Sequence, residues 1–187
     1  PEMKFYSQHT NIFAVLAGAV EGEKAQQILT RIFTEKGLSE IGLYFHHYLF
    51  EAYNKTGMDE SFQNQLSGWK EMLENNLTTF TEVALTGSRT QRSDCHPWSC
   101  SPNIYFFKTI CGIQPIEAGF EKIRIAPNPG ELKFIDASFT HPKGEIKMNL
   151  KFNNSNVSGE IFVPENIEAE FLWKGEFRKL KYGINKI

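Results

Sequence analysis

The first half of the chain places apolar residues three and four positions apart, which is the period of an amphipathic helix. Residues 103–111 repeat this pattern after a stretch from Leu77 to about Pro102 that we expect to be a loop. Four helices are predicted before that loop, over residues 7–20, 22–37, 41–57 and 58–76. Because short turns separate them, we expect helical hairpins of the kind found in bundles and toroids.

Several residues indicate where these helices begin and end. Ser7 or Thr10 can cap the first helix and Asp59 the fourth, because a side-chain oxygen accepts a hydrogen bond from a free backbone amide. Gly37 and Gly57 stand where a glycine in the left-handed conformation ends a helix.

The side chains expected to face inward in this half are large. The predicted inward positions are Ile12, Phe13, Leu16, Ala17, Val20, Ala25, Ile28, Leu29, Ile32, Phe33, Tyr44, Phe45, Tyr48, Leu49, Ala52, Phe62, Leu66, Trp69 and Leu73. Five helices with so many aromatic rings need another layer of structure to cover them. We therefore expect this half to be the tail of a larger helical domain.

After Gly112 the apolar period changes from 3.6 to 2, the alternation of a half-buried strand. Residues 144–152 show it well, because Ile146, Met148, Leu150 and Phe152 alternate with polar residues. Further strands are predicted over residues 121–127, 132–139, 156–163 and 168–173. The sequence thus predicts an α+β chain: a partial α/α toroid of helical hairpins over residues 1–114, followed by a small antiparallel β-sandwich over residues 115–187.

Composition and charge exclude several classes of function. The net charge is −2 and the basic residues are scattered, so nothing favours binding to nucleic acid. No apolar run approaches the roughly 20 residues of a membrane-spanning helix. Three cysteines are too few for a disulfide framework. The chain begins PEMKFYSQ, without an initiator methionine, so we expect a piece of a longer protein whose compartment its own start does not reveal.

The segment SDCHPWSCSP, residues 93–102, concentrates residues that could carry chemistry. A zinc site is disfavoured because no C-x-x-C pair occurs, and a Cys–His nucleophile lacks any sign of an activated thiolate. His96 could hydrogen-bond sugar hydroxyls while Trp98 stacks on a sugar face. Alternatively, Trp98 fills the core and His96 bonds a backbone carbonyl. The residues by themselves favour this second alternative.

Glu82, in the upstream segment TTFTE, is the one loop carboxylate flanked by apolar residues that we single out. Burial there could raise the pKa of its carboxyl group and suit it to proton transfer. A solvated loop glutamate is the more frequent outcome for such a residue.

Taken together, these segments resemble the C-terminal part of bacterial α-L-rhamnosidases, inverting glycoside hydrolases with a six-hairpin α/α toroid and a C-terminal β-sandwich. The resemblance runs from about residue 7 to residue 163. It depends most on SDCHPWSCSP and on GIQPIEAGFEKIRIAPNPG, which follow in the order and spacing of the family.

The resemblance implies roles for three residues. Glu82 occupies the place of the family's general base, which deprotonates the water that attacks the anomeric carbon. His96 and Trp98 occupy a segment that lines the rhamnose pocket. The implied partners are a rhamnoside substrate and the N-terminal remainder of the parent protein, and the resemblance implies no organic cofactor and no metal ligand in this chain.

The chain departs from the family in two respects. Thr81 stands where the family carries a tryptophan before its glutamate, and no segment resembles the one that carries the general acid. An inverting glycosidase needs two carboxyl groups, one as acid and one as base. We therefore expect the isolated chain to be inactive, or else to be a carbohydrate-binding or scaffold module derived from the family.

Overall fold

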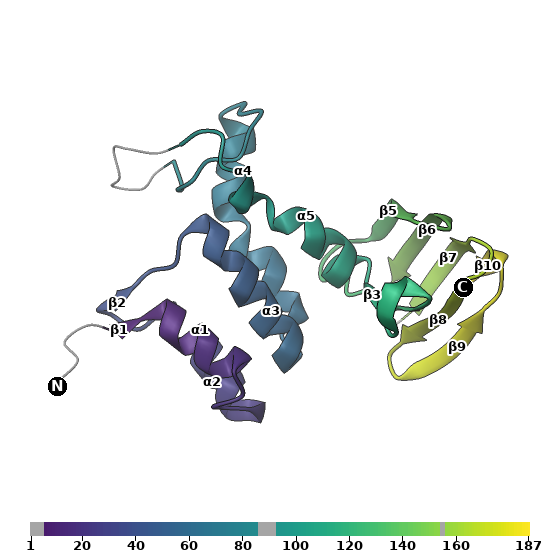
Figure 1. The fold of residues 1–187 in the computed structure, drawn as a ribbon, viewed down its shortest axis with the longest axis horizontal. Coiled ribbons are helices and arrows are strands. Elements are labelled where there is room, and N and C mark those ends of the chain that lie inside the picture. The colour runs from purple at the N-terminus through teal and green to yellow at the C-terminus, as the bar shows by residue number, and fades with distance from the viewer. Residues whose placement is uncertain (1–5, 86–92, 154–155) are drawn as a thin grey trace. The chain divides into compact units, whose positions relative to one another are not determined.

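The computed structural model describes residues 6–85, 93–153 and 156–187. The chain divides into two compact units, residues 1–103 and residues 104–187, and each is described by itself. The first unit is helical and the second is built mainly of strands (Figure 1).

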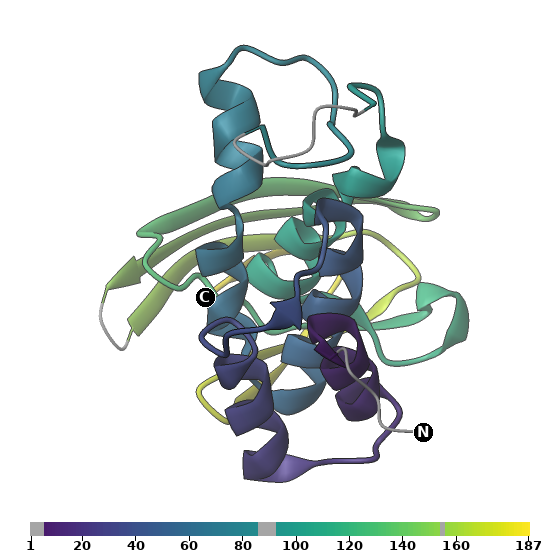
Figure 2. The same ribbon diagram turned by 90° about the vertical axis from the view of Figure 1, so that its left-hand side faces the viewer.

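Within residues 6–85 and 93–103 the helical unit contains four α-helices. They are α1 (Gln8–Leu16), α2 (Gly22–Arg31), α3 (His46–Thr56) and α4 (Ser67–Glu74). Helices α1, α2 and α3 contact one another and lie side by side in both views (Figures 1 and 2). The connections include the parallel pair β1 (Tyr6–Ser7) and β2 (Leu38–Ser39), and the 3₁₀ turns η1 (Leu43–Phe45), η2 (Asp59–Gln65) and η3 (Pro97–Cys100).

The expected helix ends are found in two cases and not in two others. Ser7 caps α1 by accepting a hydrogen bond from the Thr10 amide at 3.2 Å, and Gly57 ends α3 with a φ of 70°. The expectation for Gly37 was wrong, because α2 already ends at Arg31. Asp59 does not cap a long fourth helix either, because the segment forms the 3₁₀ turn η2 before α4 begins.

Fewer of the apolar residues in the helical unit are buried than the sequence pattern predicts. Large side chains that are fully buried include Ile12, Leu29, Leu49, Phe50 and Phe62. Other residues expected to face inward are instead exposed, namely Phe13, Phe33, Tyr44, Tyr48 and Leu73. The apolar surface of these helices is thus wider than the surface that the unit's own elements cover.

The second unit is a pair of four-stranded sheets. Their strands are β3 (Ile113–Pro115), β4 (Lys122–Ile125), β5 (Phe134–His141), β6 (Gly144–Asn153), β7 (Asn156–Val163), β8 (Glu168–Trp173), β9 (Glu176–Leu180) and β10 (Gly183–Lys186). One sheet has the order β10-β7-β6-β5 and the other β3-β4-β8-β9. The neighbours pair antiparallel except β4 and β8, which are parallel. The α+β class expected from the sequence is confirmed.

The short helix α5 (Pro102–Tyr105) includes the last residues of the first unit and the first residues of the second, and the π-turn η4 (Phe106–Ile110) and the 3₁₀ turn η5 (Ala118–Phe120) accompany the strands. The predicted helix over residues 103–111 is therefore present, although its second half has π geometry. Strands β3, β9 and β10 were not predicted. They are short, and β9 buries only Leu180, so no period of 2 marks them.

The core of this unit lies between its two sheets. The alternating residues Ile146, Met148 and Leu150 of β6 are buried, as the period of 2 predicts. The rings of Phe152 on β6 and Trp173 on β8 lie 5.4 Å apart between centroids, which joins one sheet to the other. Burial of large aliphatic side chains at about 1.5–3 kcal/mol each accounts for the stability of such a core.

Gly112 is a position where the fold requires glycine. Its φ is 69°, and a Cβ atom there would lie 1.9 Å from the carbonyl oxygen of Ala126. The same close approach allows the Ala126 amide to donate to the Gly112 carbonyl at 3.0 Å. Gly112 thereby fixes how β3 begins beside the end of β4.

Candidate functional site

The three predicted site residues lie on two loop segments that are hydrogen-bonded to each other. The Glu82 amide donates to the Ser93 carbonyl at 2.8 Å, and the His96 amide donates to the Phe80 carbonyl at 2.8 Å. These bonds align residues 80–82 with residues 93–96 in the manner of a short ladder. Glu82 and His96 are therefore held in one local structure, although fourteen positions separate them in the chain.

The Glu82 carboxylate is half-buried, and within residues 6–85 and 93–153 it has a backbone partner in Ser93. Its Oε2 atom accepts a hydrogen bond from the Ser93 amide at 3.1 Å. A carboxylate has about four lone-pair sites, so this bond orients the group and leaves capacity to take a proton from water. Glu82 is thus neither fully buried nor a freely solvated loop glutamate, because its side chain is hydrogen-bonded to the segment of Ser93.

Thr81, where the family carries tryptophan, has its side chain inside the unit. It is fully buried, and its hydroxyl donates to the Val83 carbonyl at 2.8 Å. The Thr81 side chain thus lies in the interior of the unit, whereas Glu82 is partly exposed.

Trp98 lies on η3 and does not fill the core, because 73% of it is exposed. Its ring centroid is 6.1 Å from that of His96 and 6.1 Å from that of Tyr44. The turn that carries it is held firmly, since the Trp69 indole of α4 donates to the Ser99 carbonyl at 2.6 Å. An exposed indole on an anchored turn offers an apolar face at little further entropic cost.

Contacts between aromatic rings continue from Trp98 through η1 to α3 and α1, by way of the buried ring of Phe45. Tyr44 is 6.2 Å from Phe45, which contacts Tyr48 at 4.8 Å and Phe13 at 5.1 Å between ring centroids. The sequence pattern was wrong to place Tyr44 in the core. The predicted inward residues Phe45, Leu49 and Ala52 are buried, whereas Tyr44 and Tyr48, predicted to share their face, are left exposed.

The cysteines and the remaining histidines do not form a second centre with these residues. Cys95 is exposed, and burial raises the pKa of the Cys111 thiol to about 11. His46 packs against Trp69 at 5.2 Å between ring centroids and bonds the Gly42 carbonyl at 2.9 Å, so it belongs to the core of the helical unit. Across residues 6–85, 93–153 and 156–187, no group of three or more histidine, cysteine or acidic side chains could hold a metal ion.

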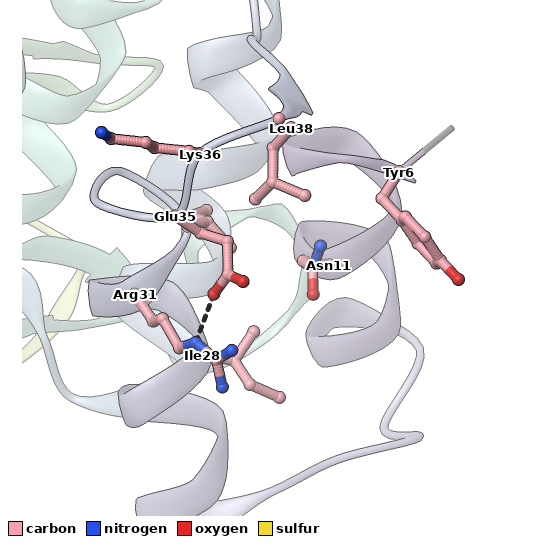
Figure 3. Close-up of a pocket in the computed structure, with 9 residues that line it drawn as sticks. Tyr6, Asn11, Ile28, Arg31, Glu35, Lys36 and Leu38 are labelled. Atoms are coloured by element: carbon pink, nitrogen blue, oxygen red, sulfur yellow. Dashed lines mark hydrogen bonds and ion pairs between the residues drawn. The ribbon is translucent and has the colours of Figure 1, made fainter. Parts of the chain in front are cut away.

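A hollow of about 370 Å³ lies elsewhere in the helical unit, between α1, α2 and β2 (Figure 3). Arg31 and Glu35 form an ion pair of 2.5 Å in its wall, and Asn11 and Tyr6 line the side opposite (Figure 3). None of the three predicted site residues lines it. Over the described residues, no helix is both long and apolar enough to cross a membrane.

The chain resembles known proteins both in sequence and in fold. Residues 112–181 match the family described as bacterial alpha-L-rhamnosidase C-terminal domain. An alpha-L-rhamnosidase of Formosa agariphila is 34% identical over 67 residues, which are 35% of this chain and 7% of that protein.

Two solved structures resemble most of the chain. The GH78 family rhamnosidase of Bacillus sp. GL1 has a TM-score of 0.77 and 26% identity, over 90% of this chain and 19% of its own. The alpha-L-rhamnosidase of Dictyoglumus thermophilum has a TM-score of 0.72 and 27% identity, over 88% of this chain and 20% of its own. The chain thus spans about a fifth of these structures. Its fold resembles theirs over 88–90% of its length, and residues 112–181 match the C-terminal domain of bacterial alpha-L-rhamnosidases.

Proposed function

We propose that this chain supplies the general base and part of the sugar pocket of an inverting α-L-rhamnosidase, with Glu82 as the base. The observation that carries the proposal is the pairing of residues 80–82 with residues 93–96, which holds the Glu82 carboxylate beside the segment of His96 and Trp98. The other part of the pocket, with the general acid, belongs to the rest of the parent protein. We place the boundary between toroid and sandwich at residue 114.

In the proposed reaction, Glu82 takes a proton from a water molecule as the water oxygen attacks the anomeric carbon. The bond to the leaving oxygen breaks while an acid outside this chain protonates that oxygen. Inverting enzymes hold the two carboxyl groups about 6.5–9.5 Å apart, so that a water molecule fits between base and sugar. One carboxyl group alone cannot complete this sequence, which is why the isolated chain should be inactive.

His96, Trp98 and Tyr44 would bind the sugar. The C–H face of a pyranose packs on an aromatic ring, and Trp98 offers the most exposed ring of the three. The imidazole of His96 can donate to or accept from a hydroxyl group, depending on which nitrogen carries the proton. Recognition by Trp98 and proton transfer by Glu82 are thus separate contributions.

The first test is an assay of the 187-residue chain with an aryl α-L-rhamnoside. We expect no release of the aryl alcohol above the buffer rate, because the acid is absent. Turnover by the purified chain that is lost in Glu82→Gln would show that the chain is itself an enzyme and would overturn the fragment proposal.

The second test uses the longer parent protein and a matched pair of variants. Glu82→Gln should lower kcat by about 10²–10⁴-fold, the usual contribution of a general base. Glu71→Gln is the control, because Glu71 also accepts a backbone amide bond at 3.1 Å, from Leu85, in the same unit. Equal losses in the two variants would mean that Glu82 only holds its loop. Azide, a nucleophile that needs no base, should restore turnover to Glu82→Gln and give a glycosyl azide of inverted configuration.

A non-catalytic carbohydrate-binding module is the second candidate. It is favoured by the exposure of Trp98 together with Thr81 in place of the family's tryptophan. Calorimetric titration of the chain with L-rhamnose, compared between wild type and Trp98→Ala, measures binding without catalysis. The upstream reading frame separates the two candidates more sharply, since an intact acid-bearing segment in the same frame favours the enzyme.

A further inference from the structure

The outward face of the sheet β3-β4-β8-β9 carries a cluster that the core does not require. Strand pairing aligns Arg124 of β4 with Glu170 of β8, and Glu170 with Lys179 of β9. The neighbouring residues Ile123 and Phe171 are buried on the opposite face. Since side chains alternate across a strand, the inner residues form the sandwich core and the outer row faces solvent.

Within this row, Arg124 is held between a carboxylate and an aromatic ring. Its Nε and Nη2 atoms both lie 2.6 Å from Oε1 of Glu170. Its Cζ atom lies 5.2 Å from the ring centroid of Phe177, on β9. The guanidinium group therefore lies over one side of the ring in a cation–π contact, and 62% of Phe177 is exposed.

A hollow of about 230 Å³ adjoins the ring. Its lining includes Phe177 and the charged residues Lys122, Glu168, Glu170, Arg178 and Lys179. Three cationic groups and two carboxylates thus surround the hollow, in a chain whose net charge is −2. Glu170 is already paired with Arg124, so positive charge is locally in excess.

A single exposed phenylalanine is common on protein surfaces and means little alone. Here, however, a guanidinium group contacts the ring, which adjoins a hollow lined by hydrogen-bond donors and acceptors. An apolar ring beside planar charged groups matches the two sides of a sugar, whose C–H face is apolar and whose edge carries hydroxyl groups. A cation excess favours a sugar that carries a carboxylate.

We propose that this face is a carbohydrate-binding site, in which a pyranose residue of an acidic polysaccharide stacks on Phe177. Its hydroxyl groups bond the Arg124–Glu170 pair, and Lys122 and Lys179 attract its carboxylates. The site lies in the second unit and shares no residue with the proposed pocket of Glu82. It does not depend on the proposed catalytic role.

The test is affinity gel electrophoresis of the full chain in gels that contain polygalacturonate or, separately, the neutral polymer galactomannan. We expect polygalacturonate to retard the wild-type chain more strongly than galactomannan does. Phe177→Ala should raise the dissociation constant for polygalacturonate about tenfold or more. The matched control is Phe134→Ala, because Phe134 is 66% exposed in the same unit but lies on β5 of the other sheet; it should bind as wild type does.

Each outcome bears on the proposal. Failure of both polymers to retard the wild-type chain would overturn the site, as would equal binding by Phe177→Ala or an equal loss in Phe134→Ala. Retardation that vanishes with added salt but ignores Phe177→Ala would mean unspecific charge attraction, and this also overturns the site. Equal retardation by both polymers, lost in Phe177→Ala, would support the sugar site and overturn its preference for acidic chains. A negative result for Glu82→Gln in the parent enzyme would leave this outcome unchanged, so the two proposals fail separately.

Discussion

The two units differ in how far they cover their own apolar surface. In the sandwich unit, Leu150 and Phe171 are buried as the alternating pattern predicts, because each sheet covers the inner face of the other. In the helical unit, Phe13 and Tyr48 follow the helical period and yet are exposed. An apolar stripe on a helix thus becomes a core only where a second layer covers it. The chain spans 19–20% of two related structures, which accords with further layers in the parent protein.

The largest expected effect comes from a buried residue of the sandwich. Leu150→Ala should lower the free energy of unfolding by about 2–5 kcal/mol, since the cavity adds to the lost burial. Leu73→Ala in the helical unit is the matched control, because Leu73 is 74% exposed although its spacing places it on the inner side; it should change stability by less than about 0.5 kcal/mol. Urea unfolding followed by circular dichroism measures both. A large effect of Leu73→Ala would contradict the comparison.

A second pair of variants concerns glycines with positive φ in each unit. Gly112→Ala should cost about 1–3 kcal/mol from the clash with the Ala126 carbonyl, added to roughly 1–2 kcal/mol of backbone strain. Gly37→Ala carries only the strain, since nothing lies within 4 Å of its Cβ position. In thermal unfolding, Gly112→Ala should therefore have a clearly lower melting temperature than Gly37→Ala. The reverse order would mean that β3 can shift away from Ala126.

The pH dependence of stability should differ between the units because of His46. Burial lowers the pKa of His46 below its ordinary value of 6.5, and burial lowers the pKa of His9 as well. Between the folded pKa and 6.5 the unfolded chain binds more protons, so the helical unit loses stability as the pH falls through this window. The helical unit is fully stable, as far as His46 is concerned, at pH values above the pKa of the unfolded chain's histidine, 6.5. Helical circular dichroism in urea at about pH 7.5 and about pH 5 measures the slope; the same slope in His46→Gln would assign it to other groups.

The last and smallest effect concerns the rates at which the cysteine thiols of the two units react with a reagent. Cys95 in the helical unit is exposed, whereas Cys111 is buried and its thiol pKa is raised to about 11. Because the thiolate is the reactive form, Cys111 should react with a disulfide reagent far more slowly than Cys95 at neutral pH. Cys95→Ser should remove the fast phase of the reaction with the disulfide reagent. In denaturant the Cys111 thiol should become accessible and react fast as well. A fast phase that survives in Cys95→Ser would show that another thiol is open.

The site illustrates how far sequence reasoning extends. The segments TTFTE and SDCHPWSCSP could be singled out because they concentrate residues with chemistry, and the family resemblance joined them. Their hydrogen-bonded pairing could not be predicted, because it links backbone groups across a loop and leaves no residue pattern. The exposure of Trp98 contradicts the core alternative that composition favours, since exposure depends on what lies above the turn. The roles of Glu82, His96 and Trp98 in catalysis and binding stay predictions.

The sequence by itself determined the two periods, the change of period near Gly112 and the capping role of Gly57, because each depends on neighbours within a few residues. Only the tertiary structure decided which apolar faces are covered, as Tyr44 and Leu73 illustrate. It also decided the parallel pairing of β4 with β8 and the stacking of Arg124 on Phe177. These features join residues that are far apart in the chain, and a local pattern carries no information about such partners.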